Sequence, residues 1–111
     1  MIRHVAEDQN FRNAVLQSNK KLVIVDFWAP WCKPCQAMEP AWESISRRFT
    51  SILDIVKVNV DDADDIAKAS NVKSIPTIIF YQNGQVIKVE QGFKDEAYLT
   101  GVISDLLKNQ L

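Results

Sequence analysis

The sequence predicts an α/β fold in which a five-stranded mixed sheet carries helices on both faces. Apolar runs of strand length alternate with segments whose apolar residues recur at helical spacing. Two of the runs are continuously apolar, which is typical of parallel strands covered on both sides. The last two runs flank an Asn-Gly pair, the signature of an antiparallel hairpin. The expected element order is βαβαβαββα.

Length and composition indicate a single domain that spans residues 1–111. A chain of 111 residues is long enough for one hydrophobic core and too short for two. The composition is that of an ordinary globular protein, with 47% hydrophobic and 24% charged residues. Thirteen Lys and Arg against fourteen Asp and Glu give a net charge of -1. We therefore expect no nucleic-acid partner.

Segments that direct a chain to a membrane are not recognisable. Uninterrupted apolar runs are no longer than that at Leu22–Val25, far below the roughly 20 residues of a membrane span. Residues 1–10 contain His4, Glu7 and Asp8 and lack the apolar core of a signal peptide. We expect a cytoplasmic, monomeric protein without a membrane partner.

The first half of the chain is predicted to form parallel strands joined by helices. Ile2–Val5 is a short first strand, and Leu22–Trp28 is a buried one. Between them, the stretch from 11 to 18 has helical spacing, with Asp8 as its N-cap. Ile55–Val60 is the next buried strand.

A long amphipathic helix is predicted to follow the strand at Leu22–Trp28. Its apolar residues recur at i, i+3, i+4, i+7 and i+11, and they are Met38, Ala41, Trp42, Ile45 and Phe49. Pro40 removes one backbone hydrogen bond and should kink the axis. A shorter helix is expected around Ile66, with Asn71 in the left-handed conformation after its end.

The C-terminal third is predicted to contain the hairpin and a last helix. Thr77–Tyr81 and Val86–Val89 are its strands, and Asn83 and Gly84 form the turn. Asp95 is expected to cap the last helix. The apolar face of that helix comprises Leu99, Val102, Ile103, Leu106 and Leu107.

The two cysteines, Cys32 and Cys35, are the strongest candidates for chemistry. They lie between the end of a buried strand and the start of a helix, and their spacing brings both side chains to one side of the first turn. Their Cα atoms can then lie within the roughly 4.4 to 6.8 Å that a disulfide tolerates. The helix N-terminus stabilises a thiolate at Cys32. We therefore expect Cys32 to be the nucleophile and Cys35 the resolving thiol.

Other uses of the cysteine pair fit the sequence less well. A structural disulfide would close only a very small loop, in a reducing compartment. A zinc site needs about four ligands, and only His4, which we place on the surface of the first strand, remains. A Cys-His protease lacks a recognisable second component. We therefore predict no metal site, whereas a Cys-x-x-Cys in a βαβ context indicates redox chemistry.

The residues around the cysteines carry a family resemblance. The run FWAPWCKPC, from Phe27 to Cys35, resembles the active-site segment of the thioredoxin family, and Ile75-Pro76-Thr77 resembles its cis-proline loop. Further residues stand at the expected places over essentially the whole chain: Asp26, Pro40, Lys57, Gly84 and Gly92. The resemblance implies the thioredoxin fold and a protein-disulfide reductase.

The same resemblance implies cofactors and partners. The redox-active group would be the Cys32–Cys35 disulfide, with no other bound cofactor. Its electrons would come from NADPH through a flavin-containing thioredoxin reductase, and its substrates would be disulfide-containing proteins such as reductases and peroxidases. A cis bond at Pro76 would present the backbone of Ile75 to an extended substrate segment. Trp31, Pro34, Gly92 and Phe93 would complete the docking surface, although Trp31 and Phe93 are also compatible with plain packing.

Asp26 interrupts an otherwise apolar strand, so its burial needs a reason. One reading, supported by the resemblance, places Asp26 beneath Cys35, where it exchanges protons with the thiol directly or through a water. The other pairs Asp26 with Lys57, whose strand should be adjacent. The two readings are compatible. Trp28, at the end of the same strand, is interpreted as a core aromatic.

Lys33 departs from the family pattern, which has glycine at this position. A cation beside Cys32 favours the thiolate, so we predict a reduction potential roughly 10 to 20 mV more oxidising than with glycine. The protein should remain a reductant. The added charge also favours acidic partner surfaces.

Two other function classes compete with this interpretation. An oxidase or isomerase of exported proteins would need a signal peptide and usually has His between the cysteines. A non-catalytic subunit or binding module of a larger assembly would use the fold without the thiols, and nothing in the sequence excludes it.

Overall fold

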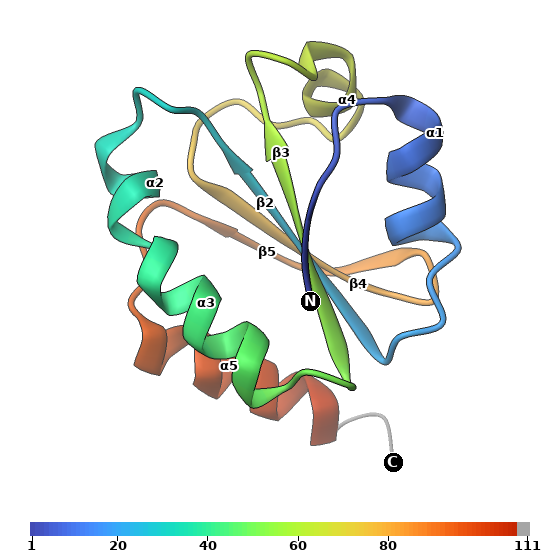
Figure 1. The fold of residues 1–111 in the computed structure, drawn as a ribbon, viewed down its shortest axis with the longest axis vertical. Helices are drawn as coiled ribbons and strands as arrows, with labels where there is room; N and C mark the ends of the chain where they lie inside the picture. Colours follow the sequence, from blue (N-terminus) through green and yellow to red (C-terminus); the bar gives the residue numbers. More distant parts are fainter. Residues whose placement is uncertain (109–111) are drawn as a thin grey trace.

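A computed structural model describes residues 1–108 and has a five-stranded mixed sheet between two layers of helices (Figure 1). The strands are β1 (Ile2–His4), β2 (Leu22–Trp28), β3 (Leu53–Asn59), β4 (Thr77–Gln82) and β5 (Gln85–Gln91). Their order across the sheet is β1-β3-β2-β4-β5. The first three strands are parallel to one another, β4 is antiparallel to β2, and β5 is antiparallel to β4. The predicted fold class is confirmed.

Helices cover both faces of the sheet and bury a separate apolar cluster on each. They are α1 (Asp8–Phe11), the π-helical η1 (Arg12–Leu16), α2 (Lys33–Ala37), α3 (Glu39–Arg48), α4 (Asp64–Ala69) and α5 (Glu96–Lys108). On one face, Phe11 and Ile66 come from α1 and α4. On the other, Trp42 and Leu99 come from α3 and α5. Figure 1 shows these two groups of helices on opposite sides of the strands.

β2 is the central strand and fixes where the functional segment lies. Its residues from 22 to 27 are buried, as the continuous apolar run predicts. β3 pairs with it on one side and places Lys57 opposite Asp26. β4 pairs on the other side and places Ile78 opposite the same residue. The charged pair therefore lies inside the sheet, two residues before β2 ends.

The predicted long helix is divided in two near Pro40. α2 ends at Ala37, Met38 forms the junction, and α3 begins at Glu39. Proline has no N–H to donate to the preceding turn, so the helix axis breaks where the kink was expected. Trp42 and Ile45 then face the core as predicted.

Two of the three predicted helix-end residues are confirmed, and the third is wrong. Asn71 has a φ of 61°, the expected left-handed conformation, and Asp95 Oδ1 accepts a 2.8 Å hydrogen bond from the Tyr98 N–H. The assignment of Asp8 as an N-cap is wrong. Asp8 is the first helical residue, and its carboxylate accepts a 2.9 Å hydrogen bond from Arg12 Nε. The preceding residue, Glu7, is the N-cap and makes no side-chain capping bond.

The first helix also differs in its winding. A regular helix was expected to Ser18, but the helical segment ends at Leu16 and its second part is a π-helix. There the Gln17 N–H donates to the Arg12 carbonyl, a bond that spans five residues. Apolar spacing alone does not distinguish this winding from an α-helix.

The predicted hairpin turn is confirmed. Asn83 and Gly84 both have positive φ, at 51° and 76°, as a tight turn between β4 and β5 requires. A Cβ on Gly84 would lie 2.6 Å from the carbonyl oxygen of Leu16. Gly84 is therefore needed both for its conformation and for the close approach of η1. No helix within residues 1–108 has the length and apolar character to cross a membrane.

Candidate functional site

The two cysteines form a disulfide at the N-terminus of α2. Their Cα atoms are 5.3 Å apart, and Cys32 is the extended N-cap residue. Its sulfur accepts a 3.3 Å hydrogen bond from the Cys35 backbone N–H. Pro34 lies in the first turn, where its missing N–H costs little. Both cysteines are buried, with Cys32 5% exposed and Cys35 2% exposed.

Three loops converge on the disulfide. Cys32, Cys35 and Ala29 form a small buried cluster, against which Trp28, Val60 and Ile75 pack. The Ile75–Pro76 peptide bond is cis, as the family resemblance implied. The carbonyl of Pro76 accepts a 2.9 Å hydrogen bond from the Gly92 N–H. The structure therefore places Ile75 against the cysteines and Gly92 against Pro76.

An exposed rim surrounds the buried sulfurs. Lys33, Pro34 and Phe93 are exposed, and Trp31 is 66% exposed. The Trp31 indole N–H donates a 3.0 Å hydrogen bond to Asp61, which orients the ring. Asp61 was not predicted as a site residue. It belongs to an acidic stretch that follows β3, and β3 ends beside the end of β2, so its position was a usable signal.

A hollow beside the disulfide runs from Trp31 to Ile75. It has a volume of about 570 Å³ and opens to solvent. Its floor is apolar and includes Val60, while Asp61 and Lys73 contribute charge at its margin.

Asp26 and Lys57 form a buried ion pair under the active segment. Each side chain is 2% exposed, and the Lys57 Nζ lies 3.4 Å from Asp26 Oδ2. Burial raises the pKa of Asp26 from its ordinary 3.8 to about 6, against the opposing attraction of Lys57. The predicted pairing of these residues is confirmed. Within residues 1–108, Asp26 makes no direct hydrogen bond to Cys35.

Glu39 joins this pair and was not found from the sequence. Lys57 Nζ donates a hydrogen bond to Glu39 Oε1, and it also lies 4.9 Å from the centroid of the Trp28 ring. Glu39 stands beside Met38, at the edge of the apolar face of the helix. That position was the only signal, and it also fits an ordinary surface residue.

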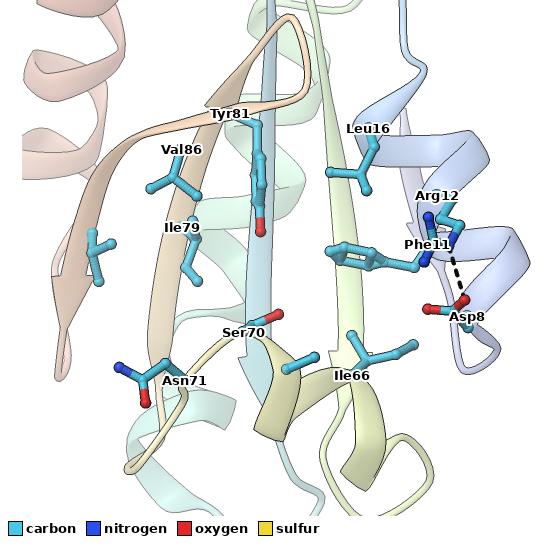
Figure 2. Close-up of a pocket in the computed structure, with 12 residues that line it drawn as sticks. Asp8, Phe11, Arg12, Leu16, Ile66, Ser70, Asn71, Ile79, Tyr81 and Val86 are labelled. Atoms are coloured by element: carbon cyan, nitrogen blue, oxygen red, sulfur yellow. Dashed lines mark hydrogen bonds and ion pairs between the residues drawn. The ribbon is translucent and has the colours of Figure 1, made fainter.

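A separate pocket of about 390 Å³ lies between α1 with η1, α4 and the β4–β5 hairpin (Figure 2). The rings of Phe11 and Tyr81 meet there edge to face, with centroids 6.2 Å apart. The Asp8–Arg12 ion pair is at its rim. Burial raises the pKa of Tyr81 above its usual value of 10.0, with Ser70 nearby. No predicted site residue lines this pocket.

The predicted surface position of His4 is confirmed, because the residue is exposed on β1. Its ring meets Trp28 edge to face at 6.4 Å. In the part of the chain that the structure describes, no three His, Cys, Asp or Glu side chains gather as a metal site would require.

Comparison with known proteins identifies the family. The thioredoxin family model matches residues 3–105. The chain is 40% identical over 102 residues to a thioredoxin of Mycobacterium tuberculosis, covering 92% of this chain and 87% of the relative. It is 41% identical over 102 residues to a bifunctional thioredoxin reductase/thioredoxin of Mycobacterium leprae, covering 92% of this chain and 22% of that protein.

The structural comparison agrees. The crystal structure of Malassezia sympodialis thioredoxin superimposes with a TM-score of 0.84 at 30% identity, over 96% of this chain and 91% of that one. The fold, the Cys32–Cys35 disulfide at the start of α2 and the matched family model together make this protein a thiol-disulfide oxidoreductase. The chain belongs to the thioredoxin family.

Proposed function

We propose that Cys32 is the attacking nucleophile of this protein-disulfide reductase and that Cys35 resolves the intermediate. The observation that carries this assignment is the position of the Cys32 sulfur at the helix N-terminus, within 3.3 Å of the Cys35 backbone nitrogen. The backbone N–H and the helix dipole both favour negative charge on that sulfur.

The reaction proceeds by two exchanges. The Cys32 thiolate attacks one sulfur of a substrate disulfide, that disulfide breaks, and the first substrate thiolate leaves. Cys35 then loses its proton and attacks the Cys32 sulfur, so the bond between Cys32 and the substrate breaks. The second substrate thiolate leaves and is protonated. Two electrons have passed to the substrate, and the Cys32–Cys35 disulfide has formed.

Asp26 is proposed as the acceptor of the Cys35 proton, directly or through a water. A pKa of about 6 suits this role because the group changes its protonation close to neutral pH. Lys57, 3.4 Å away, is proposed to hold Asp26 in place and to stabilise its negative charge. The buried position of all three groups keeps other proton donors out.

An extended substrate segment is proposed to dock across the hollow beside the disulfide. The backbone of Ile75, next to the cis bond at Pro76, would pair with the substrate as an added strand. Residues around the disulfide would contact its side chains: the exposed Trp31, Lys33, Pro34 and Phe93, and the half-buried Gly92.

Thioredoxin reductase is the proposed electron donor, supplied by NADPH. The bifunctional thioredoxin reductase/thioredoxin of Mycobacterium leprae, which joins the two proteins in one chain, supports this partner. The proposed substrates are disulfide-containing proteins, reductases and peroxidases among them. We further propose that residues 1–111 act as one monomeric domain in the cytoplasm.

Turnover of insulin disulfides with NADPH and a thioredoxin reductase tests this function. The parent protein is expected to support continuous NADPH oxidation, and Cys32→Ser to lower it roughly a thousandfold or more, because serine is not ionised near neutral pH. Rapid iodoacetamide alkylation of the reduced protein at mildly acidic pH should modify Cys32 first. Preferential modification of Cys35 would contradict the assignment.

Lys33 is expected to make the protein slightly more oxidising. Its side chain is exposed at the first position of α2, next to Cys32. Lys33→Gly should therefore make the reduction potential roughly 10 to 20 mV more negative, measured by equilibration with glutathione. Lys33→Gln should shift it the same way, and the charge-retaining Lys33→Arg should not. A more positive potential in the glycine variant would refute the charge argument.

A further inference from the structure

The ammonium of Lys57 lies between two carboxylates from different elements. Its Nζ is 3.4 Å from Asp26 on β2 and directly contacts Glu39, the first residue of α3. The surroundings of the two acids differ, because the Asp26 side chain is 2% exposed and that of Glu39 is 42% exposed. Glu39 thus keeps water and the positive end of a helix beside its charge.

Glu39 holds the Lys57 ammonium more closely than Asp26 does. The ammonium is 3.4 Å from Asp26 Oδ2, near the outer limit of a hydrogen bond, so its contact with Asp26 is a weak one. The ammonium also donates a hydrogen bond to Glu39. Asp26 therefore shares its cation with Glu39 and has the longer of the two contacts, which stabilises its carboxylate less than a short, direct hydrogen bond would.

The other elements around Asp26 supply little charge. β4 places the apolar Ile78 opposite it, and α3 brings the Trp42 indole, which lowers the pKa of Asp26. The charges that act on Asp26 are Lys57, which lowers its pKa, and Glu39, which raises it. Removal of Glu39 would therefore act on Asp26 in two ways, by deleting a like charge and by freeing Lys57.

We propose that Glu39 is a positioning residue for the disulfide chemistry: by sharing the Lys57 ammonium and holding it more closely than Asp26 does, it weakens the hold of Lys57 on Asp26, and so leaves Asp26 basic enough to accept the proton of Cys35. The inference rests on the proposed function, in which Asp26 is that acceptor.

The basicity of Asp26 affects the resolving step of the reaction. The Cys35 S–H proton passes to Asp26, and the Cys35 sulfur bonds to the Cys32 sulfur while the bond from Cys32 to the substrate breaks. The leaving substrate thiolate takes a proton from water. Asp26 returns its proton to solvent before the next cycle. A more basic Asp26 makes the first transfer more favourable.

The test compares Glu39→Gln with Glu43→Gln, which removes an exposed carboxylate one turn further along α3. Carbon-13 NMR of the Asp26 carboxyl in the reduced full chain measures its proton affinity. We expect that affinity to fall roughly threefold to tenfold in Glu39→Gln and in Glu39→Ala, and to stay at the parent value in Glu43→Gln.

Stopped-flow measurement of mixed-disulfide resolution against pH supplies the kinetic readout. In Glu39→Gln the acid limb of the profile should move to lower pH, and the plateau rate should fall about twofold to threefold because the base is weaker. A structural role of Glu39 alone would lower stability without moving the limb.

Two results overturn the inference in distinguishable ways. An unchanged Asp26 titration in Glu39→Gln refutes the coupling through Lys57, whatever Asp26 does in catalysis. If the titration shifts but Asp26→Asn resolves mixed disulfides at the parent rate and with the parent pH profile, the proton role of Asp26 in the proposed function is wrong, and the positioning role of Glu39 fails with it.

Discussion

Replacement of Cys35 by serine is expected to abolish turnover and to leave the protein covalently joined to its substrate. Cys32 can still attack, but no thiol remains 5.3 Å away, Cα to Cα, to break the mixed disulfide. Insulin reduction should fall roughly a thousandfold or more, since the intramolecular step has a very high effective thiol concentration. Non-reducing electrophoresis and mass spectrometry would detect the trapped species.

Cys32→Ser is the matched control, because it distinguishes the attacking cysteine from the resolving one. Cys32→Ser lacks the proposed nucleophile and should trap nothing, although it has lost the same number of sulfur atoms. The reverse pattern, with a trapped adduct at Cys35 in the Cys32→Ser protein only, would show that the inner cysteine attacks first. Such a result would overturn the reading of the helix N-terminus as the source of reactivity.

Asp26→Asn is expected to stabilise the folded protein at pH 8 by about 1 to 3 kcal/mol. Asp26 has an ordinary pKa of 3.8 and a folded-state pKa of about 6, so between these values the folded protein binds more protons than the unfolded chain. Its stability therefore falls as the pH rises through this window, and the full cost is present above it. Asparagine has no such titration, and Lys57 keeps Glu39 as its partner.

Urea unfolding of the oxidised protein at pH 4 and pH 8 measures this effect. Near pH 4 the folded parent already carries a largely protonated Asp26, so the two proteins should differ little. Asp105→Asn, an exposed change on α5, should be close to neutral at both pH values. An equal gain at pH 4 and pH 8 would mean that packing, and not the buried charge, is responsible.

Strong local signals predicted most of the fold. β2 was predicted from a continuous apolar run, which is typical of a strand covered on both faces. The hairpin was predicted from Asn83 and Gly84, two residue types that tolerate positive φ. The π-helical winding of η1 was missed because an extra residue in one turn leaves the apolar spacing almost unchanged. Asp8 was misplaced because an acidic residue is equally suitable one position later, inside the first turn.

Some features of the candidate site could also be predicted from the sequence, and others could not. The cysteine spacing is local, and the Asp26–Lys57 pairing follows from the pairing of two strands that their apolar runs predicted. The cis bond at Pro76 came from the family resemblance, because an X–Pro sequence alone gives only a base rate. Glu39 was missed because apolar patterns predict which strands pair but not which polar residue of a helix reaches a strand, and glutamate is common on helix surfaces.

The central place of β2 has a consequence for local unfolding. β1 and β5 form the edges of the sheet, and each has only one neighbouring strand. Fraying of either edge leaves β2 paired with β3 and β4, so slow amide hydrogen exchange should persist beneath the disulfide while the margins open. The redox centre is thus attached to the portion of the molecule that loses its structure last.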